Sequence, residues 1–396
     1  MTTIGMITEY NPFHSGHRYH IHETRQRFGE DAGVICVMSG NWVQRGDAAL
    51  ADKWTRTTAA LRGGADLVLE LPTLWAVSSA EAFARGGISL LNATGLVDLL
   101  SFGSEAGELA PLQKAAVCLS SVEYQDALRR ELDRGHSFAL ARQEAASALL
   151  GDEANCLKTP NNNLGIEYLR ALKDLESPIT PVTLLRQGAP HDSEDLPSSF
   201  ASASFLRARF LAGDGNALSS YLTEEDLVLL EEVGPASLSF CARGVLARLR
   251  TLSPQELALL PDSGEGLYNR LFEAAQAARS LEELYDLTKT RRYTHARIRR
   301  LVLWAFLGLK ASDRTPSPPY LRVLGMNERG RSLLRRMKGT ATLPILTKPA
   351  HANRLDGDAQ RVFRLEARCT GLYDLCRRDF ELSPGRGEFT ENPVLL

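Results

Sequence analysis

The sequence predicts an α/β fold, a doubly wound parallel sheet in the first half of the chain, followed by a helical second half. Four short apolar runs alternate with helical patterns over residues 16–28, 52–62 and 78–92; the runs are TIGMITEY, GVICVMSG, ADLVLELP and VDLLSFGSE. Such runs are typical of strands buried on both faces of a parallel sheet. Their alternation with helices indicates a doubly wound order. A helical pattern over residues 164–175 precedes a weaker run, ITPVTLLRQG, which we expect to close the sheet.

The pattern changes after about residue 212. Segments such as LTEEDLVLLEEV and NRLFEAAQAARSLEELYDL have helical periodicity, and Ser, Thr or Pro stands at the helix starts. The second half therefore reads as all-helical. Because 396 residues exceed what one core usually holds, we expect two domains. Residues 1–212 would carry the sheet, residues 213–396 would be mainly helical, and GDGN at 213–216 would join them.

Composition restricts the class of protein. The net charge is −2, so any nucleic-acid surface must be local rather than spread over the molecule. The six cysteines form no CxxC pair, which argues against a zinc ribbon or a redox dithiol and fits free thiols in a reducing compartment. No cationic leader and no apolar run of membrane-spanning length is present. We expect a cytoplasmic protein without a membrane partner.

Four histidines follow the first predicted strand, in the stretch IGMITEYNPFHSGHRYHIHE. Gly16 allows a tight turn into a helix, whose N-terminus presents free N–H groups to an anion. His14 and His17, three apart, can both donate to the same phosphate. A half-buried histidine pair and a zinc site are the alternatives. His20 lies about a turn further on and no other ligand stands nearby, so we expect no metal; His22 reads as a solvated residue.

Polar residues also stand where each predicted strand ends. The carboxyl ends of parallel strands meet at the edge of the sheet where ligands bind. Neither a Walker A loop nor GxGxxG is present, so nucleotide binding would have to use HSGH. The residues at this edge are Glu9, Asn11, His14, His17, Ser39, Gly40, Asn41, Gln44, Arg45, Glu70, Gly103, Ser104 and Glu105.

These motifs resemble a known family. EYNPFHSGH is similar to the HxGH motif of the nucleotidyltransferase superfamily, which includes the class I aminoacyl-tRNA synthetases. Seven stretches resemble, in order, the tRNA(Met) cytidine acetate ligase family as far as Arg300: MSGNWVQRGDAALADKWTR, GADLVLELP, SSAEAFARGGI, FGSE, TPNNNLGIEYLRAL, SASFLR and TKTRRYTHARIRR. Two departures are Ser15, where the family commonly has Asn, and Pro190 in GAPHDS, where it has Tyr.

The resemblance implies a ligase that uses ATP, bound with Mg²⁺, to activate acetate as acetyl-adenylate. It would transfer the acetyl group to the wobble cytidine of elongator tRNA(Met), forming N4-acetylcytidine. His14 and His17 would be catalytic. The nucleotide-binding residues would be Ile7, Glu9, Tyr10, Asn11, Pro12, Phe13, His14, Gly16, His17, His20, Gly103, Asn162 and Arg186. Taken singly, Gly103 could be a turn glycine, Asn162 a helix N-cap and Arg186 a surface ion-pair residue.

Two further groups are expected to contact acetate or tRNA. The first forms the other wall of the site and consists of Ser39, Asn41, Gln44, Arg45, Lys53 and Arg56, with Trp42 either stacked on a base or buried. The second is a basic run without acids, consisting of Lys289, Arg291, Arg292, Arg297, Arg299 and Arg300. The rings of Tyr293 and His295 could stack on loop bases between these cations. The alternative for the basic run is a solvated helix face.

Two other functions compete with this one. The chain could be a nucleotidyltransferase whose adenylated product leaves free, although the basic run argues against it. It could also be a non-catalytic RNA-binding protein with a nucleotide pocket, against which the intact HSGH and the polar strand ends argue.

Overall fold

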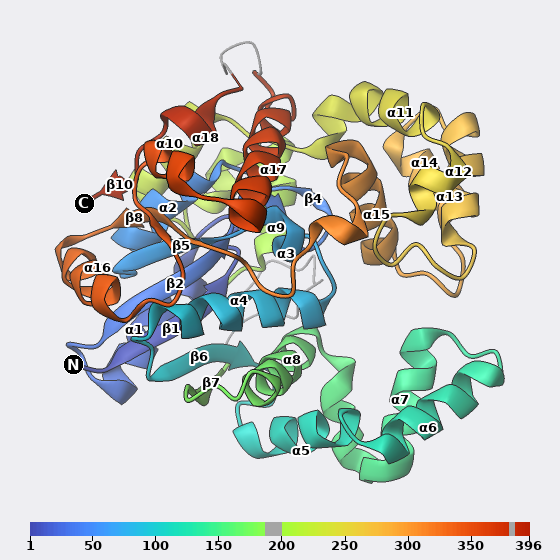
Figure 1. Ribbon diagram of the computed structural model, residues 1–396, viewed down its shortest axis with the longest axis horizontal. Coiled ribbons are helices and arrows are strands. Elements are labelled where there is room, and N and C mark those ends of the chain that lie inside the picture. The colour runs from blue at the N-terminus through green and yellow to red at the C-terminus, as the bar shows by residue number, and fades with distance from the viewer. Residues whose placement is uncertain (187–199, 380–384) are drawn as a thin grey trace.

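The structure is a computed structural model that describes residues 1–186, 200–379 and 385–396. Its centre is a sheet in the order β10-β8-β5-β2-β1-β6-β7, with β9 paired to β8 (Figure 1). Neighbouring strands are parallel except β5 and β8, which are antiparallel. The strands are β1 (Thr3–Thr8), β2 (Gly33–Ser39), β5 (Leu67–Leu71), β6 (Leu99–Ser104), β7 (Thr180–Leu185), β8 (Leu321–Met326), β9 (Ile345–Leu346) and β10 (Val394–Leu395). A separate hairpin pairs β3 (Trp42–Val43) with β4 (Asp47–Ala48).

Helices cover both faces of this sheet, which confirms the doubly wound α/β prediction. Alternate side chains along β1 and β2 point to opposite faces, as the pleat requires. Ile4 and Val34 pack in the core beneath α1 and α2. Ile35 and Val37 pack on the other face, in the core that contains the buried residues of α4. The helices of this half are α1 (Ser15–Phe28), α2 (Lys53–Arg62), α3 (Thr73–Ala76), α4 (Ala80–Thr94), α5 (Leu109–Leu119), α6 (Val122–Asp133), α7 (Phe138–Leu150), α8 (Pro160–Asp174) and α9 (Ala203–Leu211).

The second half is mainly helical, but it is not all-helical as its sequence suggested. β8, β9 and β10 extend the sheet from the edge of β5. All six residues of β8, LRVLGM, are buried, including Arg322. The strand with which β8 pairs, β5, lies more than two hundred residues earlier, so nothing local marked this segment as a strand. The sheet thus crosses the expected domain boundary, and a division at residue 212 stays a prediction.

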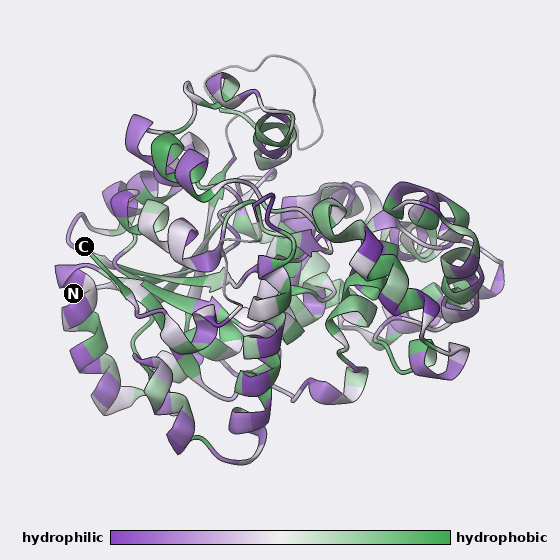
Figure 2. Ribbon diagram, turned by 90° about the horizontal axis from the view of Figure 1, so that it is seen from above, coloured by the Kyte–Doolittle hydropathy of each residue, from purple (hydrophilic) through white to green (hydrophobic). Residues whose placement is uncertain are grey.

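The remaining helices surround the sheet and extend away from it. We call α11 to α15 the helical lobe; it lies at the right of Figure 1, next to the β3–β4 hairpin. In Figure 2 the strands are coloured hydrophobic and the helices around them carry hydrophilic turns. These helices are α10 (Glu224–Val233), α11 (Ala242–Arg250), α12 (Pro254–Ala258), α13 (Leu267–Ala277), α14 (Leu281–Thr288), α15 (His295–Leu307), α16 (Glu328–Thr340), α17 (Gly357–Asp374) and α18 (Gly387–Thr390).

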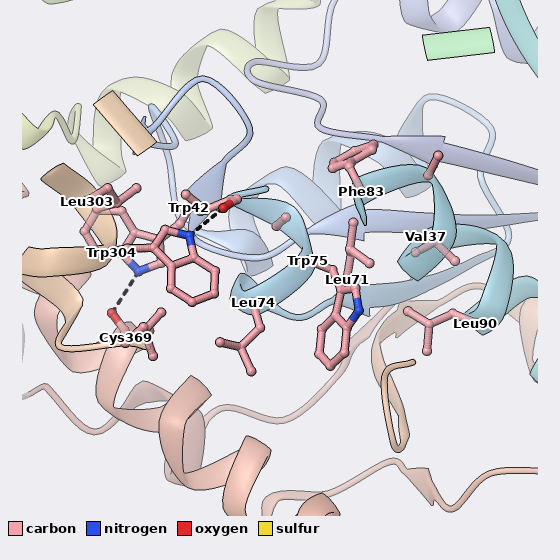
Figure 3. Close-up of a cluster of buried hydrophobic side chains, with 14 of the residues drawn as sticks. Val37, Trp42, Leu71, Leu74, Trp75, Phe83, Leu90, Leu303, Trp304 and Cys369 are labelled. Carbon is pink, nitrogen blue, oxygen red and sulfur yellow. Dashed lines mark hydrogen bonds between the residues drawn. The ribbon is translucent and has the colours of Figure 1, made fainter. Parts of the chain in front are cut away.

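Buried tryptophans join the sheet, the helical lobe and α17 into one core (Figure 3). Trp42 donates from Nε1 to the carbonyl of Cys369 at 3.0 Å, and Trp304 donates to the carbonyl of Val77 at 2.6 Å. Trp42 is fully buried, so the buried interpretation of this residue is confirmed and the stacking one is wrong. No helix in the described ranges is long and apolar enough to cross a membrane.

Candidate active site

The turn from β1 into α1 packs two histidine rings against each other, with their planes tilted by 36°. His14 is the N-cap of α1, and its Nδ1 accepts a hydrogen bond from the backbone N–H of Gly16 at 3.1 Å. The backbone N–H of His14 donates to Nδ1 of His17 at 3.3 Å, and the ring centroids lie 3.8 Å apart. A Cβ at position 16 would come within 2.9 Å of Cε1 of His14. Glycine therefore allows the ring to fold back over the turn.

These contacts fix the chemistry of both rings. Because a backbone N–H donates to each Nδ1, the neutral imidazoles carry their hydrogen on Nε2. Burial lowers the pKa of His14 to about 3, and the nearby cations of Arg186 and Arg207 act in the same direction. Burial, with His14 and Arg186 nearby, also holds the pKa of His17 well below its usual range. At neutral pH the pair offers two uncharged Nε2–H donors beside a helix N-terminus.

The other predicted residues of this turn pack around His17 or lie beside it. The ring of Tyr10 lies edge-on to His17 at 4.9 Å, and Phe13 packs against both rings. Asn11 accepts from the backbone N–H of Leu50 at 2.7 Å through its side-chain oxygen. Ile7 packs against Gly87 of α4. The predicted nucleotide contacts of Ile7, Glu9, Tyr10, Asn11, Pro12, Phe13 and Gly16 stay predictions.

His20 is held by the sheet one turn further along α1. Its Nε2 is hydrogen-bonded to Oγ of Ser101 at 3.0 Å, and burial, with Arg186 nearby, lowers its pKa to about 4. Since Nε2 already has a partner, the predicted nucleotide contact of His20 gains no support and stays a prediction. His22 is exposed, as expected.

The ends of β6 and β7 bring a second group to the same edge. The carboxylate of Glu105 accepts from the side-chain amide of Asn161 at 2.6 Å and from the backbone N–H of Asn162 at 2.8 Å. The side-chain oxygen of Asn162 accepts from the backbone N–H of Ala106 at 3.0 Å. Since α8 starts at Pro160 with Thr159 as its N-cap, the alternative that Asn162 caps this helix is wrong.

Arg186 joins this group to the histidines. Its backbone N–H donates to the carbonyl of Ser104 at 2.9 Å, and its side chain crosses over Gly103, 3.1 Å from where a Cβ would lie. Its charge acts on the pKa of His14, His17 and His20. In the described part of the chain Arg186 forms no salt bridge, so the surface ion-pair alternative is not supported. The structure thus brings Gly103, Asn162 and Arg186 near the histidine pair.

Arg207 is a site residue to which the sequence analysis gave no role. It lies on α9 and donates to the carbonyl of Asn11 at 2.7 Å and to Oγ of Ser204 at 3.0 Å. Its charge also acts on the pKa of His14. The motif SASFLR was the available signal, but only the folded chain brings α9 to the turn before α1.

The β3–β4 hairpin forms the opposite side. A carboxylate oxygen of Glu9 accepts from the backbone N–H of Gln44 at 2.7 Å, which fixes the hairpin to the end of β1. Arg45 is exposed at its tip. Ser39 and Asn41 are buried, and the side-chain oxygen of Asn41 accepts from the backbone N–H of Lys53. Because both side chains are buried, a direct contact of either with tRNA is not supported. A contact of Ser39 or Asn41 with acetate, and the contacts of Gln44 and Arg45, stay predictions.

Lys53 and Arg56 were expected to reach substrate, and the structure contradicts both. Lys53 is fully buried and paired with Glu70 at 2.6 Å and with Glu388. Burial lowers the pKa of Lys53, but Glu388 and Glu70 more than offset this and raise it. Arg56 is buried too, and it donates to the carbonyls of Glu9, Ser39, Gly40 and Ala51. The sequence analysis expected these two side chains of α2 to be accessible. It could not show their burial, because the segments that cover α2, which are β8, β10 and α18, come from the far end of the chain.

The basic run is divided between exposed and structural cations. Arg291 and Arg292 are exposed, whereas Arg297 pairs with Glu265 at 3.1 Å. The stacking role expected for Tyr293 is wrong, because this side chain is buried and its hydroxyl donates to the carbonyl of Glu265. His295 is exposed at the start of α15. RNA contacts of Lys289, Arg291, Arg292, Arg297, Arg299 and Arg300 stay predictions.

Two other features bear on the site. In the ranges that the structure describes, no cluster of three or more His, Cys, Asp or Glu side chains could hold a metal. The variant motif GAPHDS lies outside those ranges. A cavity of about 550 Å³ lies on the other side of α1, lined by residues such as Arg18, Arg62 and Tyr221. It contains none of the predicted site residues.

The chain is similar to known proteins along its whole length. Residues 1–386 match the HIGH Nucleotidyl Transferase family. A tRNA(Met) cytidine acetate ligase of Caldanaerobacter subterraneus subsp. tengcongensis is 39% identical, and the match covers 97% of each chain. The protein of the same name from Acetivibrio thermocellus is 36% identical over the full length of both chains.

Two solved structures are similar as well. Thermotoga maritima TmcAL in its apo form I has a TM-score of 0.94 at 31% identity, with full coverage of both chains. The same protein bound with alpha-thio ATP has a TM-score of 0.92, again at 31% identity and with full coverage.

Proposed function

Because the chain belongs to the tRNA(Met) cytidine acetate ligases within the HIGH Nucleotidyl Transferase family, we propose that it activates acetate with ATP and acetylates the wobble cytidine of elongator tRNA(Met). The reaction has two steps. The acetate oxygen attacks the α-phosphorus of ATP and displaces pyrophosphate, giving acetyl-adenylate. The exocyclic amine of the cytosine then attacks the acetyl carbon and displaces AMP, giving N4-acetylcytidine. We assign the reaction to the cytoplasm.

The histidine pair supports the first step. The attacking carboxylate needs no general base, so the protein must hold the reactants in line and stabilise charge on the triphosphate. The Nε2–H groups of His14 and His17, next to the N-terminus of α1, are donors suited to that charge. A well-placed donor can contribute about 3 kcal/mol to such a transition state. Mg²⁺ would arrive bound mainly by the phosphates of ATP.

The rest of the nucleotide would lie along the ends of β6 and β7. The related protein bound with alpha-thio ATP supports ATP as the ligand. The exposed guanidinium of Arg186 would meet a phosphate. Gly103, whose missing Cβ leaves room for the Arg186 side chain, would contact the nucleotide beside it. Glu105 positions this wall by holding Asn161 and Asn162. We add Arg207 to the proposed phosphate partners because its charge already reaches His14.

Delivery of the cytidine would come from the side of the helical lobe. The backbone of Arg299 and Arg300 lies against the hairpin that carries Gln44 and Arg45. Arg291 and Arg292, which are exposed on the helical lobe close to Arg299 and Arg300 in sequence, would add further positive charge for the tRNA phosphates. We therefore propose that residues 1–212 make acetyl-adenylate and that residues 213–396 bind the tRNA.

The observation that carries the proposal is the pair of neutral histidines at a helix N-terminus, whose Nδ1 atoms accept backbone hydrogen bonds and whose Nε2–H groups have no hydrogen-bond partner among the residues that the structure describes. ATP–pyrophosphate exchange with and without acetate tests it directly. Acetate-dependent exchange, together with transfer of labelled acetate to tRNA, is the expected result. Exchange with another acid would favour a different nucleotidyltransferase, and tRNA binding without any exchange would favour a non-catalytic RNA-binding protein.

A further inference from the structure

The cavity on the outer side of α1 has no part in the proposed adenylation. It has a volume of about 550 Å³ and three walls, which are one face of α1, residues 62–64 at the end of α2, and residues 220–223 before α10. Its lining residues on α1 include Ser15, Arg18 and His22, whose spacing of three and four positions puts them on one face of the helix. A cavity of this volume is large enough to hold a small organic ligand or a nucleotide.

Two arginines at this cavity share one buried carboxylate. A guanidinium N–H of Arg18 donates to one oxygen of Asp226 at 3.3 Å, and Arg62 lies 3.5 Å from the other oxygen. The side chain of Asp226 is 3% exposed, whereas those of Arg18 and Arg62 are 40% and 35% exposed. Among the described residues that line the cavity, none is Asp or Glu. Two guanidinium charges at the cavity thus share a single carboxylate.

Most of the donors of these two guanidiniums are unused. A guanidinium has five N–H groups, and its hydrogen bonds to a carboxylate are usually about 2.7–2.9 Å long. In the described ranges Arg18 has no hydrogen bond besides the long one to Asp226, and Arg62 has one of 3.4 Å to the carbonyl of Glu225. The two side chains can therefore bind an anion, and the flat, forked guanidinium matches the geometry of a phosphate.

The cavity lies directly next to the histidine turn. The backbone N–H of Ser15 donates to the carbonyl of Tyr221 at 2.7 Å, which joins two walls of the cavity at the first turn of α1. On the third wall, a Cβ on Gly63 would come within 2.0 Å of Cζ of Phe13, the ring that packs against His17. A polymer that presents one nucleotide to the histidine pair would therefore have its neighbouring nucleotides beside this cavity.

We propose that this cavity binds a nucleotide next to the target cytidine of the tRNA, with a phosphate between Arg18 and Arg62. The identity of the RNA rests on the proposed function, and the phosphate chemistry rests on the cavity itself. The single charge of a phosphodiester matches the one guanidinium charge that Asp226 does not compensate. The rings of His22 and Tyr221, which also line the cavity, can stack on the base.

Binding of an RNA hairpin with the anticodon stem and loop of elongator tRNA(Met), measured on the full-length protein without ATP or acetate, tests the proposal. Arg18→Gln and Arg62→Gln should each weaken binding about tenfold, because each removes charged hydrogen bonds to a phosphate. Each should also reduce the slope of log affinity against log salt by about 0.7. Either variant alone leaves Asp226 with the other arginine.

Arg27→Gln is the matched control for these two variants. Arg27 is also an arginine of α1, but it pairs with Glu23 at 2.6 Å and does not line the cavity, so its loss should leave binding and slope unchanged. Unchanged binding in either cavity variant, or an equal loss in Arg27→Gln, would overturn the proposal.

Chemical modification of the unsubstituted protein gives an answer even if a variant fails to fold. Phenylglyoxal modifies arginines, and peptide mapping measures its reaction at Arg18 and Arg62. The RNA hairpin should slow this reaction more than AMP or pyrophosphate, which carry the same phosphate chemistry, does at the same concentration. Equal or greater protection by AMP or pyrophosphate would assign the cavity to a free nucleotide, and no protection by any of the three would mean that it binds no phosphate. Either result would overturn the tRNA site.

Acetate-dependent ATP–pyrophosphate exchange distinguishes a failure of this proposal from a failure of the proposed function. Absence of exchange in the unsubstituted protein would contradict the proposed function and would not change the result at the cavity. Normal exchange without any effect of Arg18→Gln and Arg62→Gln on RNA binding would contradict the cavity site alone.

Discussion

Gly46 of the β3–β4 hairpin lies directly against the backbone of Arg299 in α15. A Cβ on Gly46 would come within 2.5 Å of the carbonyl carbon of Arg299 and of the nitrogen of Arg300, and the φ of Gly46 is 77°. The other side of the hairpin is fixed to Glu9 through Gln44. Residues 44–46 of the hairpin therefore connect α15 to Glu9 at the end of β1.

This contact predicts that Gly46→Ala lowers transfer to tRNA more than it lowers adenylation. A Cβ has no room there and the backbone conformation disfavours it, so the free energy of unfolding should fall by about 2–4 kcal/mol. Shifting α15 should cut tRNA acetylation at least tenfold, while acetate-dependent exchange changes by less than about threefold. Gly135→Ala is the matched control, because Gly135 has a φ of 83° but no atom within 4 Å of its Cβ. Equal losses of both activities would contradict the proposed route of the tRNA.

His14→Asn should separate the structural role of this side chain from its catalytic role. Asparagine is a good N-cap and keeps an acceptor for the N–H of Gly16, but it lacks the Nε2–H donor. We expect wild-type stability in chemical denaturation and a loss of at least about 100-fold in ATP–pyrophosphate exchange. His17→Ala should lose exchange to a similar degree, and His22→Ala should not. A near-normal rate of exchange in His14→Asn would mean that His14 does not contact the phosphates.

The buried histidines predict a loss of stability on mild acidification. An unfolded imidazole takes up a proton near pH 6.5, whereas His20 in the folded protein does so only near pH 4. Between these values the unfolded state binds more protons, so stability falls as the pH falls, by at most about 1.4 kcal/mol per pH unit for each such group. Urea denaturation at several pH values between 6.5 and 4 measures this: the free energy of unfolding of His20→Gln should change less steeply with pH than that of the unsubstituted protein. The exposed control His22→Gln should keep the parent slope.

Lys53→Ala should unfold the protein far more readily while touching no substrate. Removing the lysine leaves Glu70 buried without a cationic partner and Glu388 with Arg322 alone, and breaking such a buried pair typically costs about 3–5 kcal/mol. Lys114→Ala is the control: this lysine pairs with Glu153 at 2.5 Å on the surface, and its loss should cost less than about 1 kcal/mol. A stable Lys53→Ala variant that no longer acetylates tRNA would restore the original assignment of Lys53 to the substrate.

The exposed part of the basic run should determine the salt dependence of tRNA binding. Changing Arg291 and Arg292 to glutamine should weaken binding and reduce the slope of log affinity against log salt by about 0.7 for each tRNA phosphate that no longer has a cationic partner. Acetate-dependent exchange should stay unchanged. Arg129 and Arg130 on α6 provide the control pair, since they are exposed far from the hairpin in sequence. An unchanged slope would mean that the run is a solvated face.

The sequence by itself determined the features that depend on neighbouring residues. The apolar runs and helical periods gave the doubly wound sheet, because side-chain alternation and helix pitch are local properties. The HSGH turn was also readable, because its hydrogen bonds join residues two or three positions apart. The family could also be recognised from the sequence, because its motifs are continuous stretches of neighbouring residues.

Only the tertiary structure decided which polar residues face a substrate. Lys53 became a core residue because α18 brings Glu388 to it from the far end of the chain, and Arg56 was turned inward to four backbone carbonyls. Arg207 reached His14 through α9, and Arg299 reached Gly46 through α15. A charged side chain looks the same in sequence whether water or a buried partner surrounds it. The segments that remove the water are distant in the chain, so burial and ion pairing are fixed only when the fold is complete.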